Sequence, residues 1–101
     1  RHAEVWLVDS DDPDLNAHLA WTLADAARTV AALRADGERV LLHCVAADHR
    51  TPAAALAYSH LLGTAVGAAA RIEDAIGHRV GGLLWQTAAQ TAGGRYRSSD
   101  R

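Results

Sequence analysis

Residues 39–52 read RVLLHCVAADHRTP, and this stretch decides the fold that the sequence predicts. Its first part, residues 39–43, is a short apolar run after a glycine-containing turn, which is typical of a buried strand. Thr51 and Pro52 then open an alanine-rich segment, where threonine is a favoured N-cap and proline suits the first helical position. The pattern indicates a strand that passes through a tight turn into a helix, with Cys44 at the end of the strand.

The same alternation extends to both sides of this stretch. Residues 5–8 (VWLV) form another short apolar run and predict a strand. Between the two runs, apolar residues recur every three or four positions over residues 16–33, which predicts a helix that stops at Gly37. We therefore expect an α/β fold, with a small, mostly parallel sheet flanked by helices, in a single domain over residues 1–101.

The segments after Thr51 are expected to be helical. A helix from Thr51 closes at Gly63, and two more are predicted over residues 65–76 and 80–92, the last amphipathic through Leu83 and Leu84. The arginine- and serine-rich end of the chain is expected to be a frayed tail.

Composition narrows the functional class. A chain of 101 residues with a formal charge of −2 is long enough for one core and has no broad basic field for nucleic acid. No apolar run approaches the roughly 18 residues of a membrane span. One cysteine cannot form an internal disulfide, so we expect a free thiol and a reducing, cytoplasmic compartment.

The turn between Cys44 and Thr51 has the residues of an oxyanion site. Backbone N–H groups converge in such a turn, and the positive end of the following helix adds to their field. Arg50 can hold two phosphate oxygens, and the same field favours thiolate over thiol at Cys44. Thr51 can hydrogen-bond the sulfur, and His43 can support the turn from behind. We expect the phosphate to be held by Val45, Ala46, Ala47, Asp48, His49 and Arg50.

This H-C-x5-R-T stretch resembles the H-C-x2-G-x2-R-[ST] signature of the cysteine-based protein tyrosine and dual-specificity phosphatases, especially their small bacterial members. The resemblance implies a phosphatase-like fold and hydrolysis of phosphotyrosine or phosphoserine/threonine in proteins, or of a small phosphate ester, through a phosphocysteine. It implies no cofactor. Because family domains have strands and a helix before residue 5, it also implies an N-terminally truncated domain. His49 and His60 lack ligand-pair spacing, so no metal site is expected.

Two residues depart from the family pattern. Ala47 stands where the family has glycine, which costs stability if that position needs a positive φ. Asp48 places a carboxylate on the phosphate loop, which argues against highly anionic substrates such as phosphoinositides. These departures keep a second interpretation open, in which the chain is a catalytically weak, phosphatase-like binding or regulatory module appended to a larger protein.

The family also keeps a general-acid aspartate about thirty residues before its cysteine, and residues 9–14 (DSDDPD) occupy that place. Asp12 lies 32 residues before Cys44, whereas Asp9 lies four before Pro13, as in the D-x3-P spacing of the family. Asp11 lies between them. All three remain candidates, and Asp12 before Pro13 is also a good N-cap.

Overall fold

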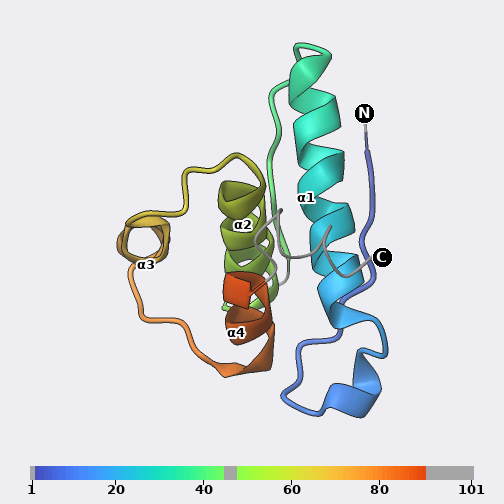
Figure 1. The fold of residues 1–101 in the computed structure, drawn as a ribbon, viewed down its shortest axis with the longest axis vertical. Helices are drawn as coiled ribbons and strands as arrows, with labels where there is room; N and C mark the ends of the chain where they lie inside the picture. Colours follow the sequence, from blue (N-terminus) through green and yellow to red (C-terminus); the bar gives the residue numbers. More distant parts are fainter. Residues whose placement is uncertain (1, 45–47, 91–101) are drawn as a thin grey trace.

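A computed structural model describes residues 2–44 and 48–90 of the chain. Their elements form a small helical bundle, shown in Figure 1. In chain order these are the 3-10 helix η1 (Pro13–Leu15) and the α-helices α1 (Leu19–Ala35), α2 (Arg50–Leu61), α3 (Ala68–Ile76) and α4 (Gly82–Gln90). The described residues include no strand, so the expected α/β fold with a mostly parallel sheet is wrong.

Both expected strands are coil instead. In residues 5–8 the backbone N–H and C=O of Val8 are bonded by the side chain of Asn16, at 2.9 and 2.7 Å, and not by a neighbouring strand. Trp6 is 86% exposed, and Leu41 in residues 39–43 is 82% exposed. A strand of an α/β sheet buries such side chains under its helices. Leu7 packs partly buried against the helical core, but neither run belongs to a strand in the described part of the chain.

The helix predicted over residues 16–33 is confirmed as α1. It begins at Leu19, because Pro13–Leu15 forms the separate turn η1, whose carboxylate cap is Asp12. Leu23, Ala27 and Val30 point into the core, as their spacing predicts. Beyond Asp36 the chain leaves the helix through Gly37, whose φ of +83° suits a residue without a Cβ.

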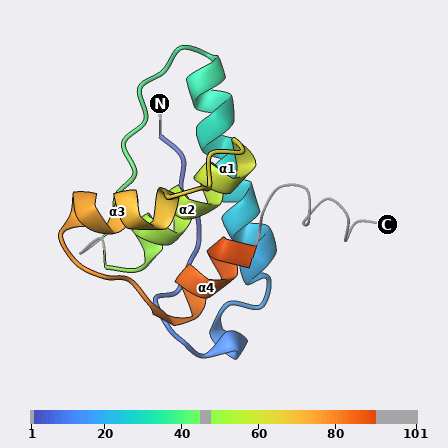
Figure 2. The same ribbon diagram turned by 60° about the vertical axis from the view of Figure 1, so that its left-hand side comes forward.

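Helix α2 is the centre of the molecule, and α1, α3 and α4 all pack on it (Figure 2). Its inner face is built from small residues, including Ala53 and Ala57, which let neighbouring helices approach closely. Leu56 fills the space between them. The core cluster comprises Leu19, Leu23, Ala27, Ala53, Leu56, Ala57, Ala68, Leu84 and Ala88.

The last two helices begin later than the sequence predicts. Helix α3 begins at Ala68 rather than at residue 65, after Gly67 in the N-cap position. Helix α4 begins at Gly82 rather than at residue 80 and buries Leu84. The end predicted at residue 92 and the predicted tail lie outside the described residues. Within the described ranges, none of the helices has both the length and the apolar character that crossing a membrane requires.

Candidate functional site

The first turn of α2 contacts the sulfur of Cys44. Thr51 Oγ1 donates a hydrogen bond to Cys44 Sγ across 2.9 Å, and the thiol is half-buried. The expectation that Thr51 caps this helix is wrong, because α2 begins one residue earlier, at Arg50, with His49 in the N-cap position. Pro52 is tolerated as the third residue, since the first N–H groups of a helix have no intrahelical partner. The hydroxyl of Thr51 does not cap the helix but donates its hydrogen bond to the sulfur.

Arg50 is the first residue of the same helix, and its Nε atom is buried without a hydrogen-bond partner among the described residues. Buried donors are nearly always paired, because an unpaired one loses its bonds to water. A guanidinium beside a helix N-terminus is suited to an oxyanion, which both the side chain and the backbone N–H groups attract. The structure therefore leaves one buried donor of Arg50 without a partner among the described residues.

Asp9 contacts His49, the residue that precedes the first turn of α2. Its carboxylate oxygens lie 3.0 and 3.2 Å from His49 Nδ1, and the two residues are 40 positions apart in the chain. Both side chains are somewhat less than half exposed. The structure thus brings one carboxylate of residues 9–12 against the residue that precedes Arg50.

The other two candidate acids serve as helix caps. Asp11 Oδ1 accepts a hydrogen bond from the backbone N–H of Leu83, at 2.9 Å, in the first turn of α4. Asp12 Oδ1 accepts one from the N–H of Asp14, also at 2.9 Å, and so caps η1, as its place before Pro13 predicts. These carboxylates satisfy helix N-termini, whereas Asp9 faces a side chain of the candidate site.

Asp48 has a neighbour that the sequence analysis did not identify. Its Oδ1 lies 3.6 Å from Nε2 of His78, in the segment between α3 and α4. Thirty positions separate the two residues, and no sequence pattern links them. When His78 is protonated, it offsets part of the negative charge that Asp48 brings to the turn.

The remaining predicted site residues are less well placed or not described. His43, the residue directly before Cys44, is exposed. Val45, Ala46 and Ala47, which were expected to bind phosphate, lie outside the described residues. In the described part of the chain, no three His, Cys, Asp or Glu side chains form a group that could hold a metal ion.

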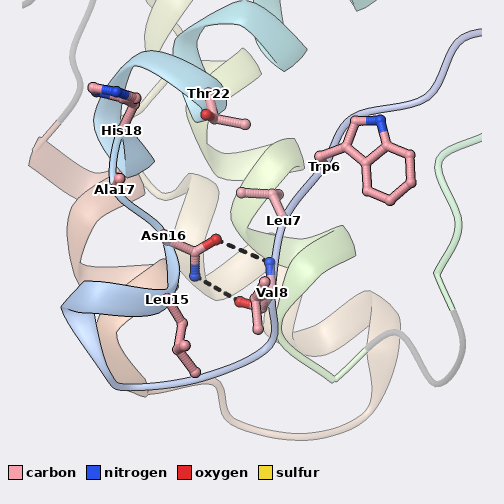
Figure 3. Close-up of a pocket in the computed structure, with 8 residues that line it drawn as sticks. All are labelled: Trp6, Leu7, Val8, Leu15, Asn16, Ala17, His18 and Thr22. Carbon is pink, nitrogen blue, oxygen red and sulfur yellow. Dashed lines mark hydrogen bonds between the residues drawn. The ribbon is translucent and has the colours of Figure 1, made fainter.

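The described part of the chain has two shallow pockets. One of about 300 Å³ is bounded by residues 6–8 and by the segment from Leu15 to Thr22, where Asn16 holds Val8 (Figure 3). One residue that lines this pocket, Val8, directly precedes Asp9 in the chain. The other, of about 430 Å³, is lined by Glu73, Asp74, His78 and their neighbours. Cys44 and Arg50 line neither pocket.

Comparisons of this chain with protein-family models, with curated proteins and with solved structures give no match. The case for a function therefore rests on the residues around Cys44.

Proposed function

We propose that this chain hydrolyses phosphate monoesters, with phosphotyrosine or phosphoserine/threonine in proteins as substrates, through a covalent intermediate on Cys44. The observation that carries the proposal is the hydrogen bond from Thr51 to the Cys44 sulfur, in the same helical turn that starts with Arg50. A sulfur nucleophile, a hydroxyl that stabilises its charge and a guanidinium for phosphate oxygens are the groups that this reaction needs.

In the first step the Cys44 thiolate attacks phosphorus in line with the leaving oxygen. The S–P bond forms as the P–O bond breaks, and an aspartic acid side chain gives its proton to the departing oxygen. Arg50 and the N–H groups of the turn hold the non-bridging oxygens, whose charge they stabilise. The first products are the dephosphorylated alcohol or phenol and a phosphocysteine.

In the second step water attacks the phosphocysteine. The aspartate, now a carboxylate, takes a proton from this water, the S–P bond breaks and inorganic phosphate leaves. Thr51 Oγ1 donates to the sulfur that regains its negative charge, which makes the thiolate a better leaving group. No metal is required for either step.

Asp9 is the carboxylate best suited to serve as the acid. Asp11 and Asp12 each accept a backbone N–H group and are thereby engaged as caps of α4 and η1. Asp9 instead lies against His49, next to Arg50 in the chain. We therefore assign the proton transfer to Asp9.

The surroundings of Cys44 also bear on substrate and compartment. The carboxylate of Asp48 is 57% exposed beside the turn, so substrates with several further negative charges are disfavoured. A thiolate nucleophile is protected from oxidation in a reducing compartment, which places the proposed activity in the cytoplasm.

The test is turnover of an aryl phosphate between pH 5 and 8 by the full chain and by Cys44→Ser, with circular dichroism to show that both are folded. We expect turnover by the unsubstituted chain and none by Cys44→Ser. Turnover that survives Cys44→Ser contradicts the proposal. Binding of vanadate without turnover in either protein also contradicts it, and favours a phosphate-binding module.

A further inference from the structure

Asp9, the proposed acid, contacts His49, the residue that precedes Arg50 at the start of α2. His49 Nδ1 lies 3.0 Å from Asp9 Oδ1 and 3.2 Å from Oδ2, so one ring nitrogen faces both oxygens of the carboxylate. Asp9 precedes α1 and His49 follows it, 40 positions apart in the chain. No helix or turn imposes this pairing locally, so tertiary structure alone maintains it.

Backbone hydrogen bonds anchor His49 and the two residues on either side of Asp9. The C=O of His49 accepts the N–H of Ala53 at 3.0 Å, which fixes His49 to the start of α2. On the other side, Val8 is held by Asn16, and the N–H of Ser10 bonds the C=O of Val8 at 3.0 Å. Asp9 therefore sits in a short anchored segment, and His49 decides where its carboxylate points.

We propose that His49 is the positioning residue that holds Asp9 for proton transfer to the leaving group, an assignment that rests on the proposed function. The Nδ1–H group donates to one carboxyl oxygen, and the other oxygen carries the proton that the leaving oxygen receives. When that proton is gone, Asp9 is a carboxylate, and the same Nδ1–H bond becomes stronger because its acceptor is now charged. The contact thus stabilises the state that proton donation produces, and it keeps the carboxylate in place to deprotonate water.

This role makes a specific prediction about side-chain geometry. The amide of asparagine places an N–H donor close to the position of Nδ1, whereas that of glutamine places it close to Nε2. His49→Asn therefore preserves the donor that Asp9 uses, and His49→Gln and His49→Ala remove it.

The experiment compares two substrates. In p-nitrophenyl phosphate the leaving group departs readily without a proton, whereas an alkyl phosphate such as a phosphoserine peptide needs one. General acid catalysis contributes about 10²- to 10⁴-fold where it is needed. We expect His49→Ala to lower kcat/KM for the alkyl phosphate at least about tenfold more than for p-nitrophenyl phosphate. His49→Asn should restore most of this difference, and His49→Gln should not.

Two further variants complete the design. Asp9→Asn should show the same selective loss, and Asp9→Asn with His49→Ala should be no more selective than Asp9→Asn alone, because both act on one proton transfer. His2 is the matched control, since its Nε2 also contacts a carboxylate, that of Glu4, at 3.4 Å on the exposed surface. His2→Ala should leave the ratio of the two substrates unchanged.

The possible failures are distinguishable. An equal loss on both substrates in His49→Ala, or no recovery in His49→Asn, overturns the role of His49 and leaves the cysteine mechanism standing. Turnover of p-nitrophenyl phosphate that does not depend on Cys44, or no turnover of it, overturns the proposed function and this assignment with it.

Discussion

The Thr51 hydroxyl donates directly to the Cys44 sulfur, so its removal acts on the reactivity of the thiol. A hydrogen bond to a charged group contributes roughly 1.5 to 3 kcal/mol. We expect Thr51→Val, which keeps the shape of the side chain and loses the donor, to lower kcat about ten- to a hundredfold. Steady-state kinetics with an aryl phosphate measure this effect.

Thr51→Ser is the matched control for this prediction, because it keeps the hydroxyl and loses only a methyl group. It should retain most of the activity. Equal activity in Thr51→Val and the unsubstituted chain would show that the sulfur does not depend on this hydrogen bond.

Arg50 is the second residue whose chemistry is specific. Lysine keeps the charge but has no planar fork, so it cannot hold two phosphate oxygens in the same way. We expect Arg50→Lys to lower kcat/KM by about 10²-fold, the order found when a donor to the transition state is removed. Arg34→Lys, at an exposed position in the last turn of α1, is the control and should have no effect. Unchanged kinetics in Arg50→Lys would argue against a phosphate held by this guanidinium.

Among the elements, α4 depends on a cap from a distant segment. Asp11 accepts the N–H of Leu83, and Gly82 beside it has a φ of +86° and no room for a Cβ, which would lie 2.7 Å from Asp11 Oδ1. Loss of a helix cap costs about 0.5 to 2 kcal/mol. We expect Asp11→Ala to lower the free energy of unfolding by about 1 kcal/mol, measured by urea denaturation, with little change in kcat.

Asp14→Ala is the control for this cap, since Asp14 is an exposed residue of η1 whose backbone N–H, not its carboxylate, bonds Asp12. It should unfold at nearly the same urea concentration as the unsubstituted chain. If Asp11→Ala instead keeps full stability and loses activity on alkyl phosphates, the proton donor is Asp11 and not Asp9.

Helix α2 depends on small side chains. Ala53 is fully buried where neighbouring helices meet, and extra methylene groups in such a position cost typically 1 to 3 kcal/mol. We expect Ala53→Leu to be destabilised by about that amount in urea denaturation. Ala32→Leu, at an exposed position of α1, should be close to neutral. A stable Ala53→Leu protein would contradict the close packing around α2.

The helices could be predicted from the sequence because their signals are local. The three-to-four spacing between Leu19 and Val30 and the stop at Gly37 are both present in α1. Their starts were less predictable. Thr51 and Pro52 resemble an N-cap and a first helical residue, but His49 and Arg50 take those positions, and the hydroxyl of Thr51 bonds sulfur instead.

At the scale of the whole molecule, the sheet could not be judged from local pattern. An apolar run such as residues 5–8 has the composition of a strand, but a strand exists only when its backbone groups find a neighbouring one. Here Asn16 supplies both bonds to Val8, and Trp6 remains exposed. The described residues pack helix against helix around α2 instead.

The candidate site was predicted in part for the same reason. Cys44, Arg50 and Thr51 lie within eight positions of one another, so their proximity follows from the sequence. The three aspartates could not be ranked, because their roles depend on distant partners: His49 for Asp9 and Leu83 for Asp11. The contact of Asp48 with His78 is equally non-local.

Trapping the phosphocysteine tests directly whether Cys44 is the nucleophile. The full chain is mixed with an aryl phosphate, quenched with acid during turnover and digested, and the peptide that contains Cys44 is weighed by mass spectrometry. We expect one phosphoryl group on the Cys44 sulfur, more of it in Thr51→Val because release of the thiolate is slowed, and none on this residue in Cys44→Ala. Turnover without a phosphorylated Cys44, or with the phosphoryl group on another residue, would contradict this role of Cys44.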